Sequence, residues 1–344
     1  MQLHIQTYGT YVHVRDEMFE IRIPVKEDVK EYKKHHFSAK KVTNILMPKS
    51  AAISTDAIIL ALKYNVDILF VDYDGHPLGR VWHSKLGSTT RIRKAQLEVS
   101  VSEEGLKWVK KWVGTKMENQ IDFVKNLRKH RTSIKDLLDQ KIKNMENLHL
   151  NLCQIEGPNV KSVSETIHGL EGTSGRLYFE VMSYVLPEIH RFSGRSRRPA
   201  KDPYNAFLNY AYGMLYGKIE KSLIIAGLDP YLGFLHRDDY NQLSMVFDFI
   251  EPYRAYCDYL VFRLFTAKKV NKSHSDAITN GFTLNKAGKE LLVHSFNNYF
   301  DNDTIRYRGR KQNRSNAIQM DAHAFANALI KTEYKESNYE KFLF

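Results

Sequence analysis

The stretch LKWVKKWVGTKMENQIDFVKNL, residues 106–127, decides the fold of the larger part of this 344-residue chain. Its apolar residues recur every three or four positions, with lysine, glutamate and other polar residues between them. They are Leu106, Val109, Val113, Met117, Ile121, Val124 and Leu127. This spacing is typical of an amphipathic helix that buries one face. The chain is therefore predicted to become helical from about residue 90 onward.

Further helices are predicted downstream, from their ends as well as from their spacing. Residues 162–185 have helical spacing throughout. Asp202 is a good N-cap, and Pro203 is a good first residue, for the helix that follows. Residues 244–265 are also predicted to form one helix, although Pro252 lies among them.

The N-terminal residues have the spacing of β-strands instead. Apolar and polar side chains alternate around Gly9 and again up to Pro24, as in half-buried strands. One helix is predicted in this region, where Ser54 caps a run of about ten residues. We therefore expect an α+β protein: a small β-rich domain with one helix at residues 1–90, followed by a larger all-α domain at residues 91–344.

The composition indicates a folded protein with a polyanionic partner. Hydrophobic residues make up 43% of the chain and charged residues 26%, which excludes a disordered or low-complexity chain. The net charge of +12 favours DNA, RNA or an anionic membrane surface as the partner, with an inert basic surface as the alternative. Cys153 and Cys257 are too few for a disulfide framework. No stretch resembles a membrane span or a signal peptide, so we expect a cytoplasmic protein.

Two carboxylates and a histidine lie in surroundings that suit a metal ion. Asp248 and Glu251 are three residues apart in a predicted helix, so both should lie on one face among apolar neighbours. Buried carboxylates need a counter-charge, which Mg²⁺ or Mn²⁺ supplies, and a neutral imidazole such as that of His236 suits the same shell. The alternative for the two acids is pairing with Arg254 or a helix cap. The alternative for His236 is a core or loop position.

A fourth candidate, Glu171, lies between glycines. Gly172 and Gly175 allow another backbone or a ligand to approach this carboxylate closely. The residues alone do not join Glu171 to the other candidates. No Walker loop and no GxSxG motif occurs, so neither an ATPase nor an esterase is indicated.

Two tracts rich in arginine and lysine are candidates for DNA binding. They are residues 191–201, just before Asp202, and residues 306–314, which contain no acid. Basic residues interleaved with tyrosine, glycine and serine suit phosphate contacts and base stacking, whereas a solvated charge run is the alternative. The candidate DNA-binding residues are Arg195, Arg197, Arg198, Lys201, Arg306, Arg308, Arg310, Lys311 and Arg314.

Four blocks of sequence, taken in order, resemble the CRISPR-associated integrase family, the nuclease subunit that inserts new spacers into CRISPR arrays. The blocks are GLEG at 169–172 with YF at 178–179, GRSRRP at 194–199 with DPYNAFLNY at 202–210, AGLDPYLGFLH at 226–236, and SMVFDFIEPYR at 244–254. The resemblance covers about residues 1–265 and implies a β-rich N-terminal domain and a helical C-terminal domain. Tyr253 stands where the family usually has Phe, and Ala255 where it commonly has Pro, but neither is a candidate ligand. The tract 306–314 lies beyond the resemblance and is argued from charge alone.

The resemblance implies a metal centre and a reaction. Glu171, His236 and Glu251 would be the ligands of Mg²⁺ or Mn²⁺, and Asp248 a further catalytic residue one turn before Glu251. The implied activity is that of a metal-dependent DNA endonuclease and integrase, which joins 3′-hydroxyl ends of short DNA duplexes into a CRISPR repeat by transesterification. The implied assembly is a homodimer joined through the β-rich domains. Together with a small ferredoxin-like CRISPR-associated partner it would form a heterohexamer on double-stranded and branched DNA.

Two other functions remain as alternatives. One is a DNA-binding scaffold without chemistry, although a scaffold needs no carboxylates near phosphates. The other is a repair nuclease that acts on branched DNA with the same site. The sequence does not separate repair from integration, whereas strand joining would.

Overall fold

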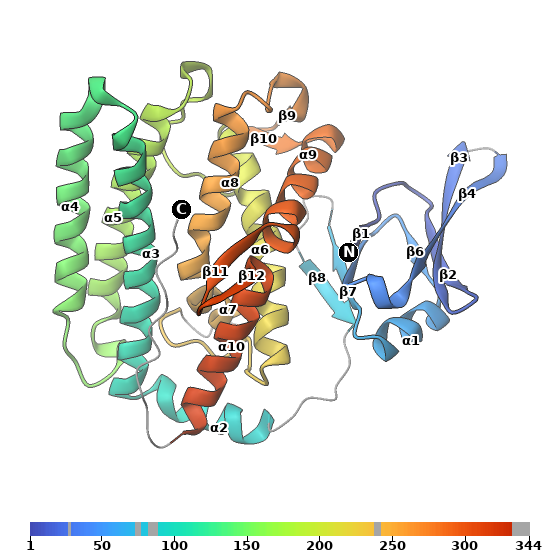
Figure 1. The fold of residues 1–344 in the computed structure, drawn as a ribbon, viewed down its shortest axis with the longest axis horizontal. Helices are drawn as coiled ribbons and strands as arrows, with labels where there is room; N and C mark the ends of the chain where they lie inside the picture. The colour runs from blue at the N-terminus through green and yellow to red at the C-terminus, as the bar shows by residue number, and fades with distance from the viewer. Residues whose placement is uncertain (27–28, 73–76, 82–88, 237–241, 332–344) are drawn as a thin grey trace. The chain divides into compact units, whose positions relative to one another are not determined.

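The computed structural model describes residues 1–26, 29–72, 77–81, 89–236 and 242–331 of the chain. The chain separates into two compact units, Met1–Lys85 and Leu86–Phe344, which we describe one at a time (Figure 1). The boundary expected from the sequence, between residues 90 and 91, lies a few residues further along. Of the residues between the two positions, 86–88 lie outside the described residues.

Short strands in two four-stranded sheets form the first unit, as the alternating spacing predicts. The strands are β1 (Gln2–His4), β2 (Tyr11–Arg15), β3 (Met18–Lys26), β4 (Val29–Ser38), β5 (Asn44–Pro48), β6 (Ala52–Ile53), β7 (Asp67–Val71) and β8 (Pro77–Val81). One sheet has the order β4-β3-β2-β6 and the other the order β1-β5-β7-β8. The helix α1 (Thr55–Lys63) begins where predicted, because the Ser54 hydroxyl accepts a hydrogen bond from the Ala57 N–H at 3.2 Å. Its apolar side packs into a core that includes Val12, Phe19, Ile45 and Ile68.

Long helices form most of the second unit. They are α2 (Thr89–Ser100), α3 (Glu103–Lys129), α4 (Lys135–Cys153), α5 (Ser164–Val185), α6 (Pro203–Ile225), α7 (Ser244–Phe249), α8 (Arg254–Thr266), α9 (Lys286–Asn297) and α10 (Arg314–Ile330). Helices α3, α4 and α5 pack side by side, and α6 packs against α8 and α10 (Figure 1). At α6, the predicted N-cap Asp202 accepts a hydrogen bond from the Asn205 N–H at 2.7 Å. None of the helices in the described ranges is long and apolar enough to cross a membrane.

The predicted fold class, a β-rich region with one helix followed by a larger helical region, is confirmed. Two hairpins in the helical unit are additions that the sequence did not predict. β9 (Ser275–Ile278) pairs with β10 (Gly281–Leu284), and β11 (Thr304–Tyr307) pairs with β12 (Arg310–Asn313). The two residues between β11 and β12 both have positive φ, 48° at Arg308 and 73° at Gly309, as a tight two-residue turn requires. Strands of four residues are too short for their alternation to stand out in the sequence.

The prediction of a single helix over residues 244–265 is wrong. Helix α7 ends at Phe249, a 3₁₀ turn follows at Glu251–Tyr253 (η5), and α8 then begins. Pro252 causes the break, because it has no N–H with which to continue the helical hydrogen bonds. At the break, the carbonyl of Pro252 accepts a hydrogen bond from Asn119 Nδ2 on α3 at 2.9 Å. Asp248 and Glu251 therefore lie in different elements and do not share one helix face.

A cluster of buried aromatic rings fixes these segments against one another. The ring centroid of Trp112, on α3, lies 5.6 Å from that of Phe234 and 6.0 Å from that of Phe249. Phe325, on α10, packs edge-on against Trp112 at 5.2 Å. Such close aromatic packing adds stability beyond the area it buries. It also holds Phe234 and Phe249 rigidly, and each of them lies two residues before a candidate site residue.

Candidate active site

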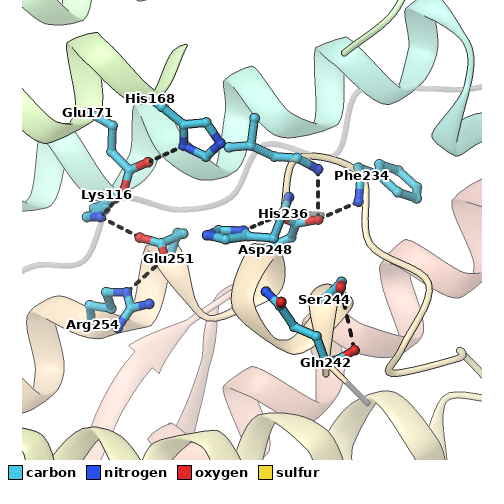
Figure 2. Close-up of polar contacts among 11 residues, drawn as sticks. Lys116, His168, Glu171, Phe234, His236, Gln242, Ser244, Asp248, Glu251 and Arg254 are labelled. Carbon is cyan, nitrogen blue, oxygen red and sulfur yellow. Dashed lines mark hydrogen bonds and ion pairs between the residues drawn. The ribbon is translucent and has the colours of Figure 1, made fainter. Parts of the chain in front are cut away.

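Four segments of the second unit bring the candidate residues together (Figure 2). Glu171 comes from α5, His236 from the segment after α6, Asp248 from α7 and Glu251 from the turn η5. The link between Glu171 and Glu251 is Lys116 on α3, whose ammonium group makes an ion pair with each carboxylate. The structure therefore joins Glu171 to the acid pair, which the residues alone did not do.

Glu251 is a buried carboxylate between two cations. Arg254 Nε donates to its Oε1 at 2.8 Å, and Lys116 Nζ lies 2.6 Å from its Oε2. Oε2 nevertheless accepts no hydrogen bond of good geometry from the residues that the structure describes. Burial would raise the pKa of Glu251, but the charges of Arg254 and Lys116 outweigh burial and lower it. The pairing with Arg254 that the sequence left open is therefore present, and the second oxygen is held by the Lys116 ammonium.

Glu171 is mostly buried, with 16% of its side chain exposed. Lys116 donates a hydrogen bond to Oε1, and His168 Nδ1 lies 3.8 Å from Oε2. Burial would raise the pKa of Glu171, but the Lys116 ammonium, helped by His168, holds it well below its usual range. A Cβ atom built on Gly172 or Gly175 would meet no other atom within 4 Å. The surface of α5 is therefore open at these glycines, and the close approach of a ligand to Glu171 stays a prediction.

Asp248 positions His236 through hydrogen bonds to both its backbone and its ring. The imidazole Nδ1 lies 2.6 Å from Asp248 Oδ1, which also accepts from the His236 N–H at 3.2 Å. Asp248 Oδ2 accepts from the N–H groups of Phe234 and Leu235 at 2.5 and 3.0 Å. Burial would lower the pKa of His236, but the hydrogen bond and charge of Asp248 outweigh burial and raise it. Since the carboxylate fixes the ring proton at Nδ1, the lone pair of the neutral ring is on Nε2.

The donor set fits a hard divalent ion in its chemistry. Glu171 and Glu251 are ionised, Glu251 Oε2 has the Lys116 ammonium as its counter-charge, and His236 has a lone pair on Nε2. Carboxylate oxygens and an imidazole nitrogen suit Mg²⁺ or Mn²⁺. In their present arrangement, the described residues contain no group of three or more histidine, cysteine, aspartate and glutamate side chains that could hold a metal ion. Between the two glutamates lies the ammonium group of Lys116.

Two residues at this site, Lys116 and His168, were missed by the sequence analysis. Lys116 lies three positions after the buried Val113 and four before the buried Gln120, so it falls on the buried face of α3. That position is the signal that could have identified it. His168 lies one turn before Glu171 on α5, and its ring is 5.8 Å from that of His236.

The basic tract at 191–201 divides into exposed and packed side chains. Arg197 and Arg198 are exposed. Lys201 is exposed too, and its Nζ donates to the carbonyl of Asn280 at 3.0 Å. Arg195 differs, because it is only partly exposed: its guanidinium lies over the ring of Tyr212 and donates to Asn205 Oδ1 at 2.9 Å. Two arginines in this tract, Arg197 and Arg198, are thus the ones most available to a phosphate backbone.

The second tract, 306–314, forms the hairpin β11–β12 and the start of α10. Arg306, Arg310 and Lys311 are exposed. Arg314 instead stacks on the ring of Tyr299, with its Cζ 3.6 Å from the centroid. Arg308 is turned toward the protein as well.

Asp321, a buried residue on α10, ties this hairpin to the candidate site. Arg308 Nη2 donates to Asp321 Oδ1 at 2.8 Å, and the Tyr307 hydroxyl donates to the same oxygen. The Tyr253 hydroxyl donates to Asp321 Oδ2 at 2.7 Å. Burial raises the pKa of Asp321 to about 6. Because Tyr253 is two residues from Glu251, the hairpin and the turn η5 share one buried anchor.

Comparisons with known proteins agree with one another. The family described as CRISPR associated protein Cas1 matches residues 3–298. The chain is 32% identical over 333 residues to the CRISPR-associated endonuclease Cas1 1 of Archaeoglobus fulgidus, with 94% of each chain covered. Its fold is similar to that of a casposase bound to its integration product, with a TM-score of 0.81 at 23% identity over 97% of this chain and 92% of that one. It is also similar to a chain of a Cas6-RT-Cas1–Cas2 complex, with a TM-score of 0.76 at 19% identity over 96% of this chain and 35% of that one.

Proposed function

Because the chain belongs to the Cas1 family of CRISPR-associated proteins, we propose that it is a metal-dependent DNA endonuclease and integrase. It would join the 3′-hydroxyl ends of short DNA duplexes into a CRISPR repeat by transesterification. The Archaeoglobus fulgidus relative is described as an endonuclease, and the casposase structure holds an integration product. We expect it to act in the cytoplasm, where such DNA lies.

One observation carries this proposal. Two ionised glutamates from distant segments, Glu171 and Glu251, share one cation, beside an imidazole whose tautomer Asp248 fixes. A scaffold has no need of two buried carboxylates near its DNA, because they would repel phosphate. A site that binds a divalent ion needs them, because the ion turns that repulsion into attraction.

Each residue would have a defined part in the reaction. Glu171, Glu251 and Nε2 of His236 would hold the ion, which when bound supplies a Lewis acid for the attacking hydroxyl, the phosphate and the leaving oxygen. Asp248 would be a positioning residue, since its two oxygens already accept the four hydrogen bonds that orient His236 and its loop. Arg254 would keep Glu251 in place. It donates to Glu251 Oε1, and its own guanidinium is held 5.0 Å from the ring centroid of Tyr212.

The chemistry balances without a nucleotide cofactor. The 3′-oxygen of the incoming strand forms a bond to phosphorus as the repeat strand loses its P–O bond at the same phosphorus. The proton of the attacking hydroxyl is lost, and the leaving oxygen gains one to become a new 3′-hydroxyl. One phosphodiester replaces another, so the protein has only to bring the two DNAs together and stabilise the charge that builds up between them. Exposed arginines such as Arg197 and Arg198 would bind the backbone.

The assembly is part of the same proposal. We expect a homodimer joined through the β-rich units, bound to a small ferredoxin-like CRISPR-associated partner in a heterohexamer. The similarity to a chain of a Cas6-RT-Cas1–Cas2 complex supports a partner of this kind. Double-stranded and branched DNA would lie across several subunits, so binding should weaken steeply with salt.

A joining assay tests the function. The purified protein and its small partner are mixed with a short duplex bearing 3′-hydroxyl ends, Mn²⁺ and a supercoiled plasmid that carries the repeat. We expect covalent transfer of the duplex, which EDTA and Glu251→Gln abolish. Glu146→Gln is the matched control, because Glu146 pairs with Lys125 at the surface and should leave joining unchanged.

The alternatives give different results in the same assay. DNA binding without cleavage or joining would indicate a scaffold and refute the proposal. Cleavage of branched DNA without joining would indicate a repair nuclease. Joining that persists in Glu251→Gln would refute the assignment of the site.

A further inference from the structure

Lys116 has an unusual position for a lysine on a long helix. Its side chain is 13% exposed, whereas that of Lys125, nine residues along α3, is 45% exposed. Its Nζ lies 2.6 Å from Glu251 Oε2 and donates to Glu171 Oε1, so one ammonium bridges carboxylates from two separate elements (Figure 2). The two oxygens that it engages belong to the two glutamates that we propose as ion ligands.

The charges around these glutamates already balance. Glu171 and Glu251 carry two negative charges, and Lys116 and Arg254 carry two positive ones. A divalent cation on the same oxygens would bring two further positive charges next to Lys116 and Arg254 in a largely buried site. Two cations on one carboxylate pair repel each other strongly at such distances. We therefore expect the divalent ion to displace either Lys116 or Arg254 from the two carboxylates.

The other contacts of Arg254 and Lys116 indicate which of the two cations is displaced. Arg254 is held in place by contacts other than the one with Glu251. It donates to the Tyr216 hydroxyl at 3.2 Å, and its Cζ lies 5.0 Å from the Tyr212 ring centroid. The ion pairs of Lys116 among the described residues are with the two glutamates. A lysine head on four flexible methylene groups also moves more readily than a stacked guanidinium.

We propose that Lys116 is a tethered counter-ion for Glu171 and Glu251 that a divalent cation displaces, and that the displaced ammonium then contacts a DNA phosphate. The lysine keeps two buried carboxylates close together before the ion arrives, so the site needs little rearrangement when it binds. Once released, the same charge lies beside the ion, where a phosphodiester would approach. This inference rests on the proposed function, because it concerns the same two glutamates.

Calorimetric titration with Mn²⁺ tests the displacement on the full chain. Lys116→Met removes the charge and keeps a side chain of similar length, and Lys125→Met is the matched control on the same helix. We expect Lys116→Met to bind Mn²⁺ at least about tenfold more tightly than the wild type, because the ion no longer competes with the ammonium, a gain equivalent to about 1.4 kcal/mol. Without Mn²⁺ the variant should melt at a lower temperature than the wild type, and Mn²⁺ should close that gap. Lys125→Met should match the wild type in both measurements.

The outcomes separate this inference from the proposed function. A wild type that binds Mn²⁺, with a Lys116→Met variant that binds it equally or less tightly, overturns the tethered counter-ion and leaves the ion site intact. A wild type and a variant that both fail to bind Mn²⁺ overturn the ion site and the inference together.

A second measurement needs no substitution and covers the case in which Lys116→Met does not fold. Acetylation of lysines in the wild type, followed by mass spectrometry, reports how accessible each ammonium is. Mn²⁺ should raise the rate at Lys116 several-fold and leave Lys125 unchanged, and a DNA duplex added with Mn²⁺ should protect Lys116 again. A rate at Lys116 that Mn²⁺ leaves unchanged overturns the displacement, and a lack of protection by DNA overturns the phosphate contact.

Discussion

Asp248→Asn is the substitution that best separates positioning from ion binding. The carboxylate accepts hydrogen bonds on both oxygens, from Phe234 and Leu235 on Oδ2 and from His236 on Oδ1. Asparagine offers only one accepting oxygen, and its amide group is a donor. Whichever way the amide is turned, its NH₂ group therefore points at N–H groups that need an acceptor.

The two orientations have different costs. If the amide NH₂ faces Phe234 and Leu235, two buried N–H groups lose their acceptor, at about 1–3 kcal/mol each. If it faces His236, the ring can relieve the clash by moving its proton from Nδ1 to Nε2. We expect this second orientation, because it unpairs one backbone N–H, that of His236 at 3.2 Å, whereas the first unpairs two, and the ring relieves its own clash by a change of tautomer. The proton then occupies the nitrogen that would bind the ion.

The expected result is a large loss of ion binding with a small loss of stability. Partners that orient a ligand in this way typically contribute a factor of about 10–100 in metal affinity. Titration with Mn²⁺ should show a loss in that range, while the free energy of unfolding in urea falls by about 1 kcal/mol, the lower end of the cost of one unpaired N–H. Asp122→Asn, on α3 outside the site, is the control that should match the wild type. An Asp248→Asn protein that binds Mn²⁺ within twofold of the wild type would refute the argument that Asp248 sets the tautomer.

Asp321 titrates near pH 6 in the folded chain against an ordinary value of 3.8, so it contributes stability that is full below pH 4 and is lost as the pH rises through 6. Between pH 5 and 7.5, urea unfolding should show the wild type losing about 1.4 kcal/mol relative to Asp321→Asn, and an equal pH dependence of the two would contradict this. Gly233→Ala should destabilise the protein by about 1–3 kcal/mol in the same assay, because its Cβ would lie 2.5 Å from that of Ser244, and an unchanged midpoint would count against it. Arg197→Ala and Arg198→Ala should each lower the salt dependence of DNA binding by about one unit, as measured by fluorescence anisotropy, and a slope equal to that of the wild type would exclude the phosphate contact.

Local chemistry made much of the fold predictable. Helix starts at Ser54 and Asp202 could be predicted because an N-cap acts within three residues of itself. The helical unit could be predicted from α3 because its apolar stripe runs along the whole element. The break at Pro252 was missed because the apolar spacing continues past it and hides the lost N–H.

The site was only partly predictable, because its decisive contacts are non-local. Glu171 could be joined to Glu251 only through a family resemblance, since the residue that bridges them, Lys116, is on a third element. A lysine in an amphipathic helix normally indicates a solvent-exposed face. Its partners are visible only once α3, α5 and η5 are packed together. Asp248 was predicted to share a face with Glu251, whereas it faces His236.

The buried anchor at Asp321 has a consequence for a chain that is still being synthesised. Every proposed ion ligand has been translated once the ribosome has passed Glu251, long before α10 emerges. Tyr253 still lacks its acceptor at that stage, because Asp321 is on α10. Phe325, which packs on Trp112 behind the same loop, is missing as well. A nascent chain would therefore hold all the proposed ion ligands without the contacts that fix their geometry, and the proposed activity would begin only when α10 has folded into place.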